Sequence, residues 1–257
     1  ALDSGEMGTI AEPLHFSLMG ALHLNGTLTG DRGRPLFNGQ IALEKWRFRG
    51  QSFGARSSQV AYQDRQLIFK KGSLQAPAGA PKKEAPYRFE GSRKFDAPPS
   101  PAFDFQIAAS SADPQEILTF FKLSIPLKTR ATGPLLVKGN PETFFVKGPL
   151  VLEKVILYGE SFDRGSLEIT VNQKEVLLKK VILQKEKQRL EGDGAIQYQG
   201  TFQVALKGSS LRLQETRAFQ SAAPGLMANS ALEVEVGGSF RKPQLKIVAA
   251  VQNLRYG

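Results

Sequence analysis

Apolar and polar residues alternate along much of this chain. Leu167, Ile169 and Val171 are separated by polar residues, and the same period of two recurs over residues 202–206 and 232–236. Such alternation is typical of β-strands with one apolar and one polar face. Sequences typical of turns lie between such segments: Asn25-Gly26, Gln63-Asp64-Arg65 and Asn172-Gln173-Lys174. The pattern predicts an all-β, mainly antiparallel fold.

Three segments depart from this alternation. Asp113-Pro114-Gln115-Glu116 combines an N-cap residue, a proline at the first helical position and an early acid, and so predicts a helix over about 113–123. A shorter helix is expected at 211–219, where the capping sequence is weaker. Residues 77–101 contain six of the 15 prolines and almost no alternation, which predicts a flexible surface loop that is dispensable for stability.

The chain contains an internal repeat. Residues 39–75 align without a gap on residues 148–184, and twelve of the 37 positions are identical. With insertions, Arg88-Phe89-Glu90-Gly91 then matches Arg189-Leu190-Glu191-Gly192, and Phe105-Gln106-Ile107-Ala108 matches Phe202-Gln203-Val204-Ala205. Self-similarity of this extent predicts consecutive copies of one structural unit.

The repeat predicts a division of the chain into successive units. Residues 1–30 would be the leading strands of a preceding unit, 31–133 the first full unit, 134–236 the second, and 237–257 the start of a truncated third. Because the sequence stops inside a unit, we expect it to be a fragment of a longer protein.

The alternating apolar residues form the candidate functional surface. A sheet with one apolar face must either cover that face or use it. The two predicted helices are few for roughly a dozen strands, which favours an uncovered apolar groove, although a closed core is the ordinary alternative. The candidate groove residues are Val60, Tyr62, Leu67, Phe69, Leu167, Ile169, Val171, Phe202, Val204, Leu206, Leu232 and Val234.

Two lysine pairs occupy matching positions in the repeat. Lys70-Lys71 and Lys179-Lys180 are each expected at the end of a strand. Exposed lysines there would discourage pairing between sheet edges. Alternatively, they would form a basic rim that faces the phosphate head groups of lipids.

The composition narrows the possible chemistry. There is no cysteine, and His15 and His23 have no carboxylate cluster between them, so disulfides, iron–sulfur clusters and common metal sites are not expected. No Ser-His-Asp order, paired-acid motif or phosphate-binding loop is present, so we predict neither an enzyme nor a cofactor. The formal charge of +10 favours acidic partners such as nucleic acid or anionic lipid head groups.

Several loose motifs carry a resemblance to a known family. Leu136-Val137-Lys138-Gly139 is followed by Gly148-Pro149-Leu150-Val151-Leu152, a Gly-x-x-Phe sequence, a strand that ends in Lys-Lys, and Arg189-Leu190-Glu191-Gly192. This order resembles the AsmA-like family of bacterial envelope proteins, to which TamB and YhdP belong. The resemblance implies an elongated, curved, repeating β-groove sheet with an apolar trough for lipid. It also implies the periplasmic part of a Gram-negative protein anchored in the inner membrane.

The favoured function is therefore to bind and conduct phospholipid, or another envelope lipid, between the inner and outer membranes. An alternative is a scaffold that assembles outer-membrane proteins by pairing with their β-edges; inner-membrane proteins are further candidate partners. Nucleic-acid binding is not favoured, because Phe69, Phe105 and Phe202 lie in the apolar stripe instead of among basic residues.

Overall fold

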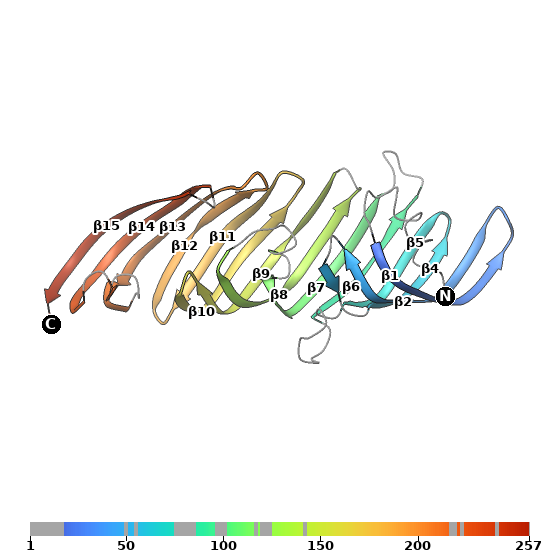
Figure 1. Cartoon of the computed structure of the whole chain (residues 1–257), viewed down its shortest axis with the longest axis horizontal. Helices are drawn as coiled ribbons and strands as arrows, with labels where there is room; N and C mark the ends of the chain where they lie inside the picture. Colours follow the sequence, from blue (N-terminus) through green and yellow to red (C-terminus); the bar gives the residue numbers. More distant parts are fainter. Residues whose placement is uncertain are drawn as a thin grey trace. The chain divides into compact units, whose positions relative to one another are not determined.

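The structure, a computed structural model, describes residues 18–48, 51–53, 56–74, 86–95, 102–115, 118, 125–140, 143–215, 220–221, 224–239 and 242–256. Within these residues, fifteen strands form one open sheet in which strands adjacent in sequence are adjacent in the sheet (Figure 1). The short β3 (Gln51–Phe53) is the exception, because it lies off this path and pairs with β2. The long antiparallel meander confirms the all-β prediction.

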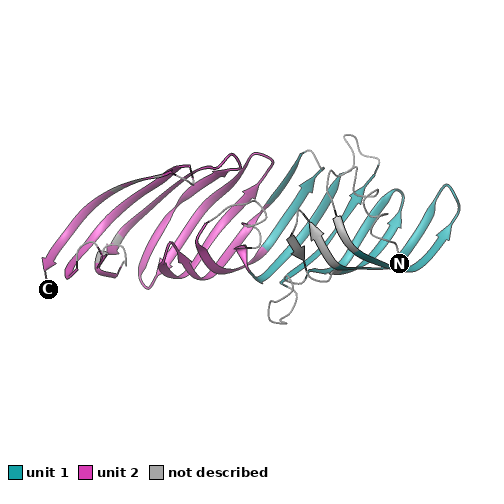
Figure 2. Ribbon diagram, in the orientation of Figure 1, with its two compact units in different colours: residues 1–112, 134–146 teal, residues 113–133, 147–257 magenta. Residues whose placement is uncertain are grey.

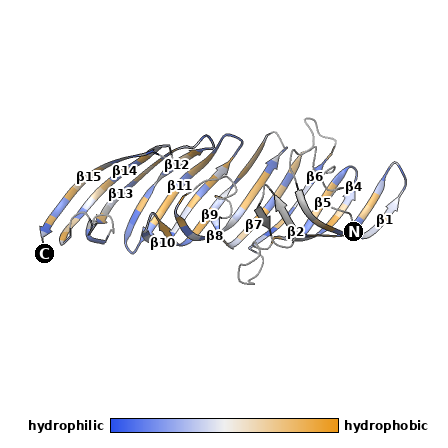
Figure 3. Cartoon of the chain, in the orientation of Figure 1, coloured by the Kyte–Doolittle hydropathy of each residue, from blue (hydrophilic) through white to orange (hydrophobic). Residues whose placement is uncertain are grey.

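The strands are long for a globular protein. In chain order, apart from β3, they are β1 (Leu18–Gly30), β2 (Pro35–Phe48), β4 (Arg56–Gln63), β5 (Gln66–Leu74), β6 (Tyr87–Lys94), β7 (Phe103–Ala112), β8 (Leu127–Gly139), β9 (Phe144–Leu157), β10 (Glu160–Val171), β11 (Glu175–Lys185), β12 (Gln188–Gln197), β13 (Thr201–Arg212), β14 (Leu226–Ser239) and β15 (Lys242–Tyr256). The hydropathy of the residues alternates along individual strands, as Figure 3 shows.

The chain divides into two compact units (Figure 2). Unit 1 comprises residues 1–112 and 134–146, and unit 2 comprises residues 113–133 and 147–257. Each unit is described separately below. None of the helical segments in the described part of the chain is long and apolar enough to span a membrane.

Unit 1 has two chemically distinct faces. Residues directly opposite each other in an antiparallel pair point to the same side of the sheet. Ile41 and Leu43 of β2 thereby share a face with Val60 of β4 and Phe69 of β5, and Phe105 of β7 joins them through Gly91 of β6. The alternate residues, which point to the opposite face, include Gln40, Gln59, Lys70, Glu90 and Gln106.

Unit 2 has a buried core at one part of its apolar face. Ala131 of β8, Leu152 and Val155 of β9, and Leu183 of β11 form a buried cluster. Val155 is 1% exposed. Leu167 and Leu206, which belong to the apolar face of β10 and β13, pack against this cluster. This part of the apolar face is therefore closely packed and removed from solvent.

Equivalent β-bulges support the repeat. The pairing of β5 with β6 shifts between Phe69 and Gly72, and the pairing of β11 with β12 shifts at the equivalent residues Leu178 and Val181. A second shift, between Ser57 and Gln59 of β4, recurs between Ser166 and Glu168 of β10. A bulge bends its strand and increases the local twist. The two units therefore bend their sheets at the same repeat positions.

The register corrects the later part of the repeat alignment. Gly91 pairs with Phe69, and Gly194 pairs with the equivalent residue Leu178, so Gly91 corresponds to Gly194 and not to Gly192. By the same pairing, Phe105 corresponds to Val204. The sequence match was wrong by two residues. A shift of two keeps every side chain on the same face, so the alternation pattern could not reveal it.

The predicted loop at 77–101 is wrong in part. Residues 87–94 of that segment form β6, which pairs with β5 on one side and β7 on the other. Tyr87, Phe89 and the residues that alternate with them supply a strand pattern that the surrounding prolines obscured. Apart from 86–95, the segment lies outside the described residues.

The helix predictions are met in part. Pro114, Gln115 and Leu118 are helical, and the backbone N–H of Gln115 donates to Asp113 Oδ1 at 3.0 Å, as expected of an N-cap. The remaining residues from 116 to 123 lie outside the described part. In the second segment, a 3₁₀ turn spans Leu213–Glu215 and residues 216–219 lie outside the description.

One of the three predicted turns is wrong. Asn25 and Gly26 lie inside β1, where Gly26 pairs with Gly39 of β2. A Cβ at Gly26 would approach the Asn38 carbonyl oxygen to 2.4 Å, so close strand packing explains this glycine. The actual turn follows at Asp31, whose Oδ1 accepts from the N–H groups of Gly33 and Arg34.

Candidate functional site: the apolar face

In unit 1 the predicted groove residues lie together. Val60 is paired directly with Phe69, and Tyr62 with Leu67, so all four side chains share the apolar face. Val60 is 4% exposed, while the other three are half-buried. Partial exposure of large apolar side chains distinguishes this face from a closed core.

A hollow of about 390 Å³ opens in this apolar face of unit 1. Phe69, Phe89 and Phe105 line it and form an aromatic cluster, with ring centroids 5.6 to 6.5 Å apart. Gly72 makes room for this cluster, because a Cβ there would lie 2.4 Å from the Phe89 ring. The other residues that line the hollow are Ile41, Leu43, Ser57, Ser58, Leu74 and Ile107. The lining is almost entirely apolar.

In unit 2 the register also gathers the predicted residues on one face. Ile169 of β10 pairs with Leu178 of β11, which pairs with Gly194 of β12, which pairs with Val204 of β13. Val171 is 5% exposed, whereas the other predicted residues are half-buried. Those half-buried residues are Leu167, Ile169, Phe202, Val204, Leu206, Leu232 and Val234.

The lysine pairs do not lie where the sequence predicted. Lys70-Lys71 and Lys179-Lys180 occupy the bulges inside β5 and β11, so their predicted place at strand ends is wrong. Lys71 and Lys180 take positive φ angles of 51° and 50°. An extra residue in a bulge is left without a ladder partner, and this allows it such a backbone conformation. The proposed head-group role of these lysines stays a prediction.

Ion pairs surround the bulge in unit 2. Asp193 lies opposite Lys179 and Lys180; its Oδ1 accepts from the Lys180 backbone N–H at 2.9 Å, and its Oδ2 lies 3.1 Å from Lys179 Nζ. Lys180 Nζ lies 2.6 Å from Glu168 Oε1. The hydrogen bond from the Lys180 backbone, followed by that from Lys179, lowers the pKa of Asp193. The hydrogen bond and charge of Glu168 raise the pKa of Lys180.

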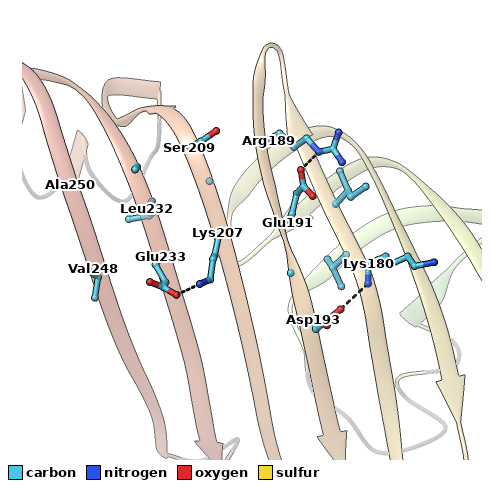
Figure 4. A pocket seen from close by; sticks show the side chains of 15 residues that line it. Lys180, Arg189, Glu191, Asp193, Lys207, Ser209, Leu232, Glu233, Val248 and Ala250 are labelled. Carbon is cyan, nitrogen blue, oxygen red and sulfur yellow. Dashed lines mark hydrogen bonds and ion pairs between the residues drawn. The ribbon is translucent and has the colours of Figure 1, made fainter.

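A larger hollow, of about 970 Å³, lies on the polar side of unit 2 (Figure 4). The side chains of Lys207 and Glu233 point toward each other there, with Nζ and Oε1 2.6 Å apart. Three basic and three acidic side chains line this hollow, so their charges balance: Lys180, Arg189, Lys207, Glu191, Asp193 and Glu233. The hollow therefore offers no excess of positive charge to a phosphate group.

The lowered pKa of Asp193 predicts a pH-dependent contribution to stability. A carboxylate with a folded-state pKa below its unfolded value of about 3.9 stabilises the fold above that value, and this stabilisation is lost as the pH falls through the folded-state pKa. The Asp193→Asn variant should therefore melt at a lower temperature than the parent chain at pH 7, and this difference should be smaller at pH 2. Circular dichroism melts at the two pH values measure this, and an equal gap at both would contradict it.

Sequence reasoning missed part of the apolar face. Phe103 and Ile107 flank Phe105 of the apolar stripe and alternate with polar residues, so their pattern could have identified them as groove residues. Arg93 of β6 also lies on this face, between Leu67 and Phe103. No sequence signal marks it, because a charged residue breaks the apolar alternation there.

The described residues contain no group of three histidine, aspartate or glutamate side chains placed to hold a metal ion. The predictions about cofactors and catalysis stay predictions. The chain matches no known family, and comparison with curated proteins and with solved structures likewise finds no similar protein. The function must therefore be argued from the geometry of the chain itself.

Proposed function

We propose that this chain binds lipid along its apolar face and forms a periplasmic, lipid-conducting part of an AsmA-like envelope protein. The supporting observation is the chemical division of the sheet: one face carries half-buried Phe, Leu, Ile and Val side chains, and the other carries paired charges. The order of motifs along the repeat is the second support. Neither support involves catalytic chemistry, so we propose a binding protein and not an enzyme.

Passive burial would hold the lipid tails. Transfer of apolar surface out of water contributes about 25 cal/mol per Å², without directional requirements. The row from Ile169 to Val204 presents apolar side chains on β10, β11 and β13, with Gly194 of β12 between them. Because no polar groups converge along this row, a tail could slide from strand to strand. We propose phospholipid, moving between the two membranes, as the substrate.

Photo-crosslinking tests this proposal. Crosslinking residues are placed singly at Ile169 and Val204 on the apolar face and at their neighbours Thr170 and Gln203 on the polar face. We expect phospholipid adducts at the first pair only, detected by mass spectrometry after exposure to phospholipid vesicles. Thr170 and Gln203 are matched controls, because each is adjacent in sequence but points to the other side. Equal labelling of both faces, or none, would contradict the proposal.

The sheet edges favour a second candidate function. Among the described residues, β1 and β15 each pair with a strand on one side only. Leu28 of β1 is 70% exposed and Leu254 of β15 is 60% exposed. Long strands with unpaired edges and exposed apolar residues can accept an added strand. A scaffold for outer-membrane proteins would therefore bind a synthetic outer-membrane β-strand peptide, and a crosslinker at Leu254 would capture it.

Nucleic-acid binding has less support. A nucleic-acid surface needs unpaired basic residues beside exposed aromatic side chains. In unit 2, Lys179, Lys207 and Lys246 each lie within 3.3 Å of a carboxylate oxygen. The aromatic cluster of unit 1 lies on the opposite, apolar face from Lys70. We therefore propose no nucleic-acid partner.

A further inference from the structure

We propose that unit 1 contains a discrete site for one fatty acid anion: the acyl chain fills the hollow lined by Phe69, Phe89 and Phe105, and its carboxylate binds Arg93. This inference rests on the proposed lipid-binding function and makes it more specific. It assigns a single ligand, with a defined orientation, to a place where the sequence pattern predicted only a continuous apolar face.

The hollow has the character of a ligand site. Its volume of about 390 Å³ lies within the range of small-molecule pockets, roughly 300–1,000 Å³, and near its lower end. The one buried polar side chain in its lining, Ser58, is already satisfied, because its hydroxyl donates to the carbonyl oxygen of Lys70 at 3.0 Å. The hollow therefore offers apolar packing and no free polar partner. A single hydrocarbon chain suits this lining.

Arg93 supplies a positive charge at one end of this surface. It is half-buried on the apolar face, opposite Leu67 on one side and Phe103 on the other. Its guanidinium carbon lies 5.1 Å from the centroid of the Phe95 ring. In the part of the chain that the structure describes, no carboxylate lies within ion-pair distance of Arg93, and its buried Nε has no hydrogen-bond partner. Burial lowers the pKa of Arg93, although an arginine stays charged.

An anion bound at Arg93 would correct this imbalance. A half-buried guanidinium has lost part of its hydration without gaining a carboxylate, and unsatisfied buried polar groups cost free energy. A carboxylate matches the planar fork of guanidinium donors and can accept two parallel hydrogen bonds. A phosphate group can match the same donors. We assign a carboxylate because the hollow accommodates a single hydrocarbon chain, and a carboxylate ends such a chain directly.

The register places the charge and the hollow in line. Arg93, Gly91 and Phe89 lie in this order on the apolar face of β6, each two residues from the next. Gly91 pairs with Phe69 on one side and with Phe105 on the other. Two residues of a strand span about 7 Å, so the backbone of Arg93 lies roughly that far from the first aromatic row. Arg93 does not itself line the hollow, and its guanidinium lies against the Phe95 ring. A chain with a carboxylate at its end would lie along the strands, with its head at Arg93 and its tail over Phe89. Because a fatty acid has its charge directly at the end of one chain, it fits this arrangement.

Unit 2 lacks both parts of the site. Ile196 occupies the position equivalent to Arg93, and it is 6% exposed. Leu167 occupies the position equivalent to Ser58 and packs against the buried core cluster. The same fold is therefore filled with aliphatic side chains in one unit and left hollow and charged in the other. This difference assigns the site to unit 1 alone.

Binding of oleate to the whole chain tests the inference. We expect one bound oleate per chain by native mass spectrometry, and at least tenfold weaker binding by the Arg93→Gln variant in calorimetry. Lys94→Gln is the matched control, because Lys94 is the next residue in β6 and points to the polar face. Its affinity should equal that of the parent chain. Methyl oleate, which lacks the carboxylate, should bind the parent chain and Arg93→Gln equally.

A second variant tests the hollow independently of the charge. Ser58→Leu introduces the residue that unit 2 carries at this position and should fill part of the hollow. It should weaken the binding of oleate and methyl oleate alike, while circular dichroism shows an unchanged fold. If phosphatidylglycerol vesicles, and not oleate, show the Arg93 dependence, the ligand is not a fatty acid and the assignment is overturned.

The two proposals can fail separately. If Arg93→Gln and Ser58→Leu bind oleate as the parent chain does, the discrete site is wrong. Phospholipid adducts at Ile169 and Val204 would then still support lipid binding along the apolar face. If those adducts are absent while oleate binding depends on Arg93, the chain holds one fatty acid and conducts no lipid along unit 2.

Discussion

Replacing Gly192 with alanine is expected to destabilise unit 2 by about 3 kcal/mol. Gly192 lies in β12 between Val181 of β11 and Leu206 of β13. A Cβ at this position would lie 1.8 Å from the carbonyl oxygen of Ala205. Overpacking a well-packed region costs about 1–3 kcal/mol, and the upper end applies because a backbone carbonyl in an inner strand cannot rotate away. Denaturant unfolding followed by circular dichroism measures the loss.

Gly194 provides a matched control two residues further along the same strand and on the same face. There the nearest atom to a new Cβ is Val204 Cγ2, at 3.0 Å, and this side chain can move. We therefore expect Gly194→Ala to cost less than about 1 kcal/mol, since alanine also reduces the entropy of the unfolded chain. Equal losses for the two variants would show that close backbone approach is not the cause.

Aspartate at Ile169 or Val204 is expected to abolish lipid binding while the fold persists. Both side chains are half-buried on the apolar face, so a carboxylate at either position can reach water. The same carboxylate would repel a hydrocarbon tail, because burying a charge without a partner is costly. One residue of the pair is replaced by aspartate and the crosslinker is placed at the other. We expect phospholipid adducts to fall more than tenfold, while a thermal melt shows that the fold persists.

Val171→Asp is the contrasting variant, because Val171 lies on the same strand and face but is 5% exposed. A carboxylate buried there has no partner, and we expect a loss of at least about 3 kcal/mol in unfolding free energy. Thr170→Asp, on the polar face, should change neither property. If Ile169→Asp unfolds the chain as Val171→Asp does, the apolar face at Ile169 is closed core, and the groove is wrong.

Local patterns predicted the strands but not their full pairing. The alternation around Ile169 and Val204 determines which side chains share a face, because a strand has a period of two. The same alternation could not reveal that Gly91 corresponds to Gly194 and not to Gly192, because a shift of two residues keeps every side chain on its face. The pairs that begin at Lys70 and Lys179 recur at matching positions of the repeat, but two adjacent lysines do not indicate a β-bulge. Only the strand pairing shows that β5 and β11 are bulged there.

By itself, the sequence determined the class of fold, the repeat and the identity of the apolar face, because these depend on short-range periodicity. Only the tertiary structure decided how far that face is covered. Leu152 and Val155 of β9 belong to a buried cluster in unit 2, whereas the apolar face of unit 1 keeps a hollow lined by Phe69, Phe89 and Phe105. Burial of this kind depends on contacts between residues distant in sequence. Alternation within a single strand contains no information about such contacts.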